Sequence, residues 1–241
     1  MTPLVLVHGF MGGAAQWAPQ LQDISQDRRV IAPDLPGFGD AAGAAPIHAI
    51  GGFADWIIAD MRARGIDRFH LLGHSMGGMI VQEVVRRAPA MVDRLVLYAT
   101  GAKGVLPGRF ETIEESKRRA AQDGPAPTAR RIAATWFLER EAAPAYEGCA
   151  EIAARSSLAA IFAGLDAMQG WSGVTHLPQI AQKTLLIWGD GDRTYPWSQV
   201  ETLWSAIPQA GLAVVPGCAH AVHLEKPAIF NAILRDFLPA D

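Results

Sequence analysis

The pentapeptide Gly73-His74-Ser75-Met76-Gly77 constrains the fold more than any other part of the chain. An apolar run precedes it at residues 69–72, and a helical pattern follows it and ends near Pro89. Glycines two residues before and after a serine allow a sharp turn from strand to helix, where larger side chains would collide with the neighbouring backbone. The serine is held in unfavourable backbone angles, at a cost of about 1–3 kcal/mol, with its hydroxyl at the helix N-terminus. The pattern predicts a nucleophile elbow in which Ser75 is the nucleophile.

Short apolar runs alternate with helical stretches on both sides of this turn. The runs expected to be strands buried on both faces are residues 4–7, 29–32, 69–72, 94–98, 184–188 and 212–215. The stretches expected to be helices are residues 17–24, 50–64, 76–87, 198–207 and 227–237. The alternation predicts an α/β fold with a mostly parallel, doubly wound sheet of about six strands.

Residues 101–182 interrupt this alternation, because they are rich in alanine and charge and show no strand pattern. Helices are expected at 111–122, 128–139 and 147–168, separated by Pro107, Pro125, Pro127 and Pro144. We predict that residues 101–182 form a helical cap inserted into a core domain of residues 1–100 and 183–241.

A serine hydroxyl needs a base within hydrogen-bond reach before it can act as a nucleophile. His220 follows the last expected strand, and the carboxyl ends of parallel strands share one edge of the sheet, so His220 can meet Ser75 there. His223 lies nearer the next helix and is expected to be structural. Both Asp190 and Asp192 follow the strand at 184–188. We favour Asp192 as the acid that orients His220, because it lies deeper in the loop, and we expect Asp190 in an ordinary Asp-Gly turn.

Hydrolysis by a serine also needs backbone amides aimed at the oxyanion. Met76, directly after the nucleophile, offers one amide, and Phe10 in the glycine-rich segment 8–13 offers a second. That segment has neither the Gly-x-Gly-x-x-Gly spacing nor a Walker lysine, so a nucleotide site is not expected.

Composition narrows the classes of partner and cofactor. A net charge of −3 gives no reason to expect nucleic acid or an acidic membrane surface as a partner. Cys149 and Cys218 form no disulfide framework, and no Cys/His cluster has metal-ligand spacing, so neither a metal nor a cofactor is expected. The first strand begins almost at Met1, and no apolar run reaches the length of a membrane span. The expectation is a cytoplasmic protein with a small-molecule substrate; the oligomeric state is left open.

Taken together, these motifs resemble the α/β-hydrolase superfamily, in the branch with a helical cap. The resemblance spans nearly the whole chain and keeps the order Ser, Asp, His. The matching segments are residues 8–10, 34–39, 73–78 and 189–192, with His220, Glu225 and Pro227 near the C-terminus. The resemblance implies a triad of Ser75, Asp192 and His220, oxyanion amides from Phe10 and Met76, and a structural role for Asp34.

Residues 76–80 and the C-terminal pattern are similar to those of β-ketoadipate enol-lactonases and small carboxylesterases. The resemblance implies a serine hydrolase that cleaves small carboxylic esters or lactones through an acyl-enzyme. One departure is the start of the chain, where seven residues precede His8 and the usual β-hairpin is missing. The antiparallel edge strand of the family is therefore not expected.

Two further classes of function remain open. One is a lyase or carbon–carbon bond hydrolase that acts on a carboxylate-bearing intermediate, which requires several arginines at the pocket; the other is a non-hydrolytic small-molecule receptor. Arg109, Arg130 and Arg131 are candidates to bind such a carboxylate, or they lie on solvated helix faces. Five aromatic residues are candidates for an apolar pocket wall, although each would serve equally well as core: Trp136, Phe137, Phe162, Trp171 and Trp197.

Overall fold

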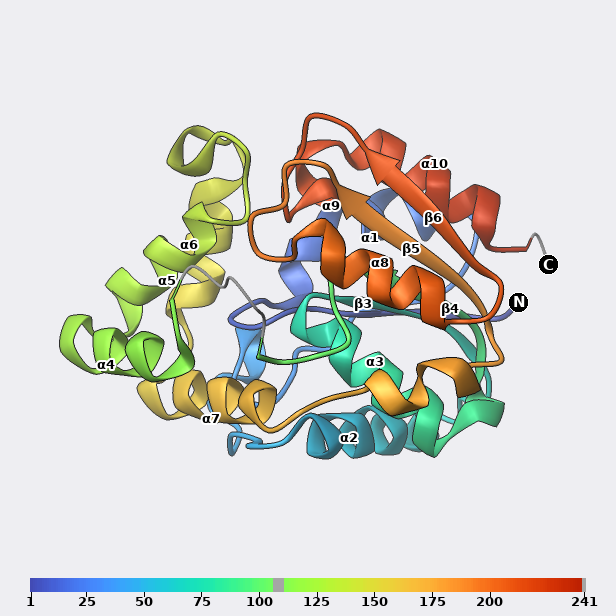
Figure 1. Cartoon of the computed structure of the whole chain (residues 1–241), viewed down its shortest axis with the longest axis horizontal. Helices are drawn as coiled ribbons and strands as arrows, with labels where there is room; N and C mark the ends of the chain where they lie inside the picture. Colours follow the sequence, from blue (N-terminus) through green and yellow to red (C-terminus); the bar gives the residue numbers. More distant parts are fainter. Residues whose placement is uncertain (106–110, 240–241) are drawn as a thin grey trace.

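The computed structural model describes residues 1–105 and 111–239, which fold around a six-stranded parallel sheet (Figure 1). The strands are Leu4–Val7 (β1), Val30–Ile31 (β2), Phe69–His74 (β3), Val92–Tyr98 (β4), Lys183–Gly189 (β5) and Ala210–Val215 (β6). Their order is β2-β1-β3-β4-β5-β6, and every neighbouring pair is parallel. The predicted fold class is confirmed.

Alternation along the strands divides the core between the two faces of the sheet. In β1, Val5 and Val7 belong to one hydrophobic cluster, whereas Leu4 and Leu6 belong to the other. Successive side chains of a strand point to opposite faces, so a strand buried on both sides must be apolar throughout. This is why β1 is a continuous apolar run.

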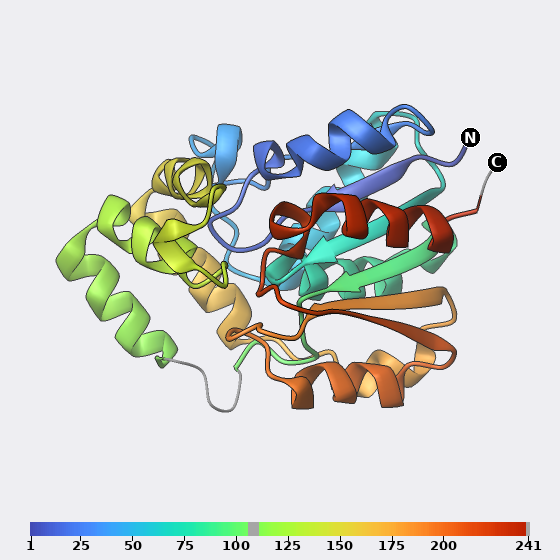
Figure 2. The ribbon, with the colours of Figure 1, turned by 90° about the horizontal axis from the view of Figure 1, so that it is seen from above.

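Helices cover both faces of the sheet (Figure 2). The helices Ala18–Ile24 (α1) and Pro227–Phe237 (α10) supply residues to the cluster on one face. The helices Ile50–Ala63 (α2), Met76–Arg87 (α3) and Trp197–Ala206 (α8) supply residues to the cluster on the other. The remaining short helices are Ala14–Trp17, Gly39–Ala41, Pro89–Met91, Arg140–Ala142, Val174–Gln179 and Val222–Glu225 (α9).

The strand order reverses between β1 and β3, because the chain runs from β1 to β2 on one side and then returns to β3 on the other. In open α/β sheets, ligands bind beyond the carboxyl ends of the strands at such a switch point. The loop after β1 and the turn after β3 both lie there, so the topology brings residues 8–13 next to Ser75.

Residues 101–182, called the cap segment below, carry the helices Ile113–Asp123 (α4), Pro125–Ala134 (α5), Tyr146–Ala154 (α6) and Leu158–Gln169 (α7). These helices lie beyond the carboxyl ends of the strands (Figures 1 and 2). The division into a core domain and an inserted cap remains a prediction. Among the described residues no single helix has the length and apolarity of a membrane span, although α6 and α7 reach it together across a 100° bend.

The helices of the cap segment differ from prediction in two places. The helix expected at 128–139 is α5, which begins at Pro125 and ends at Ala134, because the first turn of a helix tolerates proline. The helix expected at 147–168 is two helices, since Ser157 caps α7 by accepting a hydrogen bond from the Ala160 amide at 3.1 Å. A serine N-cap starts a new helix where the apolar pattern alone suggested continuity.

Candidate active site

Ser75 adopts the strained backbone that its glycines predict. Its φ of 56° and ψ of −121° lie between the end of β3 and the start of α3. A Cβ on Gly73 would come within 2.3 Å of the Gly77 carbonyl oxygen, and a Cβ on Gly77 within 2.4 Å of the Val7 carbonyl oxygen. Both glycines are therefore required, because the turn packs backbone against backbone.

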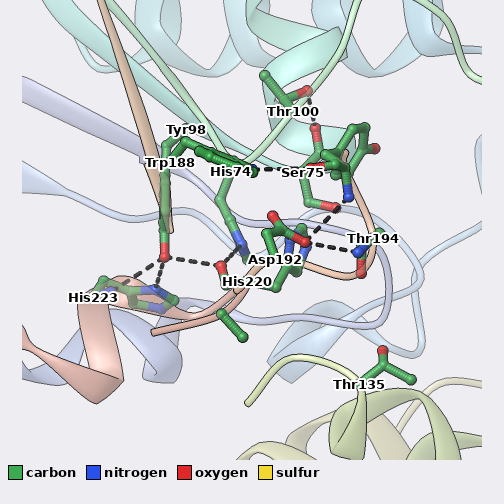
Figure 3. Close-up of polar contacts among 12 residues, drawn as sticks. His74, Ser75, Tyr98, Thr100, Thr135, Trp188, Asp192, Thr194, His220 and His223 are labelled. Atoms are coloured by element: carbon green, nitrogen blue, oxygen red, sulfur yellow. Dashed lines mark hydrogen bonds and ion pairs between the residues drawn. The ribbon is translucent and has the colours of Figure 1, made fainter. Parts of the chain in front are cut away.

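Hydrogen bonds hold the elbow to the next strand. The Ser75 amide donates to the Tyr98 carbonyl at 3.0 Å, and the Thr100 hydroxyl donates to the Ser75 carbonyl at 2.7 Å (Figure 3). Both bonds use backbone atoms of Ser75, and the residue lines the pocket described below.

His220 and Asp192 form a buried pair. Nδ1 of His220 lies 2.9 Å from Oδ2 of Asp192, and their side chains are 1% and 0% exposed. The other carboxylate oxygen, Oδ1, accepts the amides of Thr194 at 2.7 Å and Tyr195 at 3.1 Å. A carboxylate beside Nδ1 favours the tautomer with the proton on Nδ1, which leaves Nε2 free to accept one. Asp190 is directed elsewhere, because its Oδ1 accepts the Gly217 amide at 2.7 Å.

A buried polar network lies on the other side of His220 (Figure 3). The carbonyl of His220 accepts hydrogen bonds from the Tyr98 hydroxyl and from Nε2 of His74, both at 3.0 Å. Nδ1 of His223 contacts the Tyr98 hydroxyl at 2.9 Å. Burial lowers the pKa of His223 to about 3 and that of His74 well below its usual value. Both rings are therefore neutral, and the network fixes the backbone of His220 without a charge of its own.

Lowering the pH should destabilise the fold through His223. Its pKa is about 3 in the folded protein and about 6.5 in the unfolded chain, so between these values only the unfolded chain binds the proton. The contribution to stability is present above the unfolded pKa and is lost as pH falls toward the folded pKa, by up to about 1.4 kcal/mol per pH unit. His223→Gln should remove this contribution, so the unfolding free energy of the variant should fall less steeply with decreasing pH than that of the wild type. The measurement is urea denaturation from about pH 6 to pH 4. Equal slopes in the two proteins would contradict this prediction.

The loop after β1 approaches the elbow closely enough to supply an amide to the same space. A Cβ on Gly9 would lie 2.9 Å from the Ser75 Cβ, and Gly9, Phe10 and Ser75 line one small recess. The Met76 amide is in the first turn of α3, where amides have no acceptor within the helix. Asp34 braces this loop structurally, because its Oδ1 accepts the Ala14 amide at 2.8 Å. The oxyanion assignment of Phe10 and Met76 remains a prediction with compatible geometry.

A small apolar pocket opens beside Ser75 and His220. Its enclosed space is about 50 Å³, which is room for a few water-sized groups. The residues that line it are Phe10, Ser75, Gly104, Ile132, Thr135, Trp136, Met168, Thr194, Tyr195 and His220. The ring of Tyr195 stacks on that of His220 with centroids 5.7 Å apart.

Of the five aromatic candidates, Trp136 lines this pocket, and the other four are not among its lining residues. The side chain of Phe137 is fully buried in the core, and Phe162 packs against that core. Nε1 of Trp171 donates to Glu83 at 3.2 Å, and Trp197 is 38% exposed beside Trp188 and Trp204.

Two of the three arginines considered for a substrate carboxylate are paired with glutamates. Arg130 pairs with Glu147 at 2.6 Å on the surface, and Arg131 pairs with Glu111 at 2.8 Å. Arg109 lies outside the described residues. Within residues 1–105 and 111–239, no group of three His, Cys, Asp or Glu side chains has the arrangement of a metal site.

Several pocket residues were not anticipated from the sequence. Thr194 and Tyr195 follow Asp192 by two and three residues, so their position in the acid loop was an available signal. Ile132, Thr135 and Met168 come from the cap segment, where the sequence carries no signal for which helix face meets the pocket.

Comparisons with known proteins agree with this architecture. The family profile described as alpha/beta hydrolase fold matches residues 2–227. A relative from Agrobacterium fabrum, whose name of carbamate hydrolase RutD is itself provisional, is 27% identical over 99% of this chain and 94% of its own. A 2-hydroxy-6-oxo-2,4-heptadienoate hydrolase from Pseudomonas putida is 29% identical over 99% of this chain and 90% of its own. The solved structure of a thermophilic esterase from Thermogutta terrifontis is 25% identical, with a TM-score of 0.89 over 98% of this chain and 89% of its own.

Proposed function

Because the chain belongs to the alpha/beta hydrolase family, we propose that it is a serine hydrolase that cleaves small carboxylic esters or lactones through an acyl-enzyme. The proposal rests on one observation: a serine, a histidine and an aspartate lie together at one pocket. Ser75 stands on a strained elbow, His220 lines the same pocket, and Asp192 holds the far side of the imidazole at 2.9 Å.

The proposed reaction has two acyl transfers. Nε2 of His220 takes the hydroxyl proton as Oγ of Ser75 attacks the substrate carbonyl carbon, and Asp192 stabilises the resulting imidazolium. The amides of Phe10 and Met76 hold the negative oxygen of the tetrahedral intermediate. The intermediate expels the alkoxide, which receives the proton from His220, and leaves an ester on Ser75. Water then attacks this ester with His220 again as the base, which releases the acid and restores the serine.

Two of the relatives bear on the choice of substrate. The name of the Pseudomonas putida relative describes the hydrolysis of a carboxylate-bearing dienoate, which would place an anion in the pocket. The apolar lining here favours an uncharged acyl group, because a buried carboxylate without a partner is costly. The likeness to an esterase at 25% identity supports the same choice.

The test is a panel of p-nitrophenyl esters and lactones of increasing acyl length, run on the wild type and on Ser75→Ala. We expect turnover of short neutral esters that the variant lacks. The p-nitrophenyl monoester of succinic acid, of similar acyl length to the butyrate but carrying a carboxylate, should be the poorer substrate. Preference for the succinate ester would favour the carboxylate-bearing class, and absence of all turnover would favour a receptor.

Truncating the adjacent residues Trp136 and Phe137 should have different effects, on substrate preference for Trp136 and on stability alone for Phe137. Trp136→Ala removes a pocket wall and should raise KM and change the acyl-length preference, because this contact binds substrate and transition state alike. Phe137→Ala empties a fully buried site and should lower the unfolding free energy by about 3–5 kcal/mol with the preference unchanged. The acyl-length preference in the ester series distinguishes the two, because Trp136 is also mostly buried and both variants should melt at a lower temperature. An unchanged preference in Trp136→Ala would remove this residue from the acyl site.

A further inference from the structure

Glu225 is a carboxylate that the proposed reaction does not use, yet it joins two distant segments of the chain. It ends α9, five residues after His220. Its Oε1 accepts the Leu138 amide of the cap segment at 2.7 Å, and its Oε2 accepts the Ala219 amide of the histidine loop at 2.6 Å. Hydrogen bonds to an ionised acceptor are about twice as strong as neutral ones. One side chain therefore bridges the cap segment and the loop that carries the base.

Further backbone links converge on the same place. The Ala221 amide donates to the Trp136 carbonyl at 2.9 Å. The guanidinium of Arg193, the residue after Asp192, donates to the Phe137 carbonyl at 3.3 Å. Of the two amides that flank His220, that of Ala221 thus binds the Trp136 carbonyl. That of Ala219 binds the Glu225 carboxylate, which also binds the Leu138 amide. We call residues 136–138 the seat of the cap segment.

The seat also forms part of the pocket wall. The side chain of Trp136 lines the pocket beside Ser75 and His220, and Thr135 lines it from the preceding position. The bonds that join the seat to the histidine loop therefore hold this wall beside the imidazole, together with the core packing of Trp136 and Phe137.

Little side-chain packing accompanies these bonds on the side where Glu225 lies. A surface pocket of about 240 Å³ is lined there by Leu138, Glu139, Ala143, Pro144, Gly217 and Glu225. Leu138 is 38% exposed, so the Glu225 carboxylate joins the two segments along a solvent-facing edge.

We propose that Glu225 is a positioning residue that fixes the seat of the cap segment against the His220 loop, so that the acyl pocket and the base keep one relative geometry. The proposal rests on the proposed function, because it assigns His220 as the base. Glu225 acts through residues 136–138 and Ala219 and does not line the substrate pocket.

The test is Glu225→Gln, with Asp190→Asn as the matched control. A glutamine of the same shape has one acceptor oxygen, so its NH₂ group must face one of the two amide donors and that bond is lost. Asp190 also accepts an amide of this loop, from Gly217 at 2.7 Å, but no contact joins it to the cap segment among its hydrogen bonds in the described residues. Loosening the seat should lower kcat for p-nitrophenyl butyrate by about tenfold or more, because small misplacements of reacting groups are costly. It should also weaken discrimination between acyl lengths, whereas Asp190→Asn should do neither.

Amide hydrogen exchange supplies a readout that needs no catalysis. Peptides that contain residues 136–138 and 219–221 should exchange faster in Glu225→Gln than in the wild type or in Asp190→Asn. Unchanged exchange at residues 136–138, or an equal kinetic loss in Asp190→Asn, would overturn the proposal. Faster exchange in a protein whose wild type hydrolyses no ester would support the link and refute the hydrolase, so the two failures are distinct.

Discussion

Replacing Ser75 with alanine should lower kcat for a short p-nitrophenyl ester by about 10⁴-fold or more, because nucleophile and base act as one unit. The fold should be unaffected, since alanine keeps the Cβ of serine and the elbow is held by the backbone amide and carbonyl of residue 75. The measurement is steady-state hydrolysis together with a thermal melt.

A matched control is Ser156→Ala, a buried serine that lies in the connection between α6 and α7 and does not line the pocket. It should keep full activity. His220→Ala should resemble Ser75→Ala, whereas His223→Ala should retain far more activity, since His223 contacts Tyr98 rather than the pocket. An inactive His223→Ala beside an active His220→Ala would show that the base is misassigned.

Substituting Asp192→Asn should lower kcat by about 10⁴-fold through the tautomer of His220. Oδ1 of Asp192 accepts two backbone amides, so the amide oxygen of the asparagine must take that place. The NH₂ group then faces Nδ1 of His220, which can no longer carry its proton there. The proton moves to Nε2, and the ring cannot accept the proton of Ser75.

The pH dependence of the same variant gives a second check, because the loss should persist at high pH, where a merely weakened base would recover. Asp190→Asn should be nearly silent, since its carboxylate accepts only the Gly217 amide among the hydrogen bonds described for it. Equal losses from the two variants would mean that the orienting acid has been misread.

The sequence predicts the sheet and the elbow well because both depend on local requirements. A strand buried on two faces must be apolar throughout, and a turn that packs backbone on backbone must contain glycine, as the space around Gly73 and Gly77 shows. The placement of His220 and Asp192 at one edge follows from the parallel strands that precede them.

The pocket wall was harder to predict, because it depends on which face of each helix the tertiary packing turns inward. Trp136 and Phe137 are adjacent aromatic residues, yet only Trp136 lines the pocket while Phe137 is fully buried in the core. Nothing in the sequence shows which of these two adjacent aromatic residues faces the pocket and which faces the core. The sequence did not predict that Glu225 joins two segments, because its partners are backbone amides, which every residue except proline carries.

The cap segment is seated through main-chain atoms, and this has an evolutionary consequence. The groups that residues 136–138 offer to the rest of the protein are the carbonyls of Trp136 and Phe137 and the amide of Leu138. Almost any residue supplies these groups, so a substitution of Trp136, whose side chain lines the pocket, removes none of these hydrogen bonds. Under the proposed function, new substrate preferences can arise at Trp136 by single substitutions that leave Ser75 and His220 unchanged.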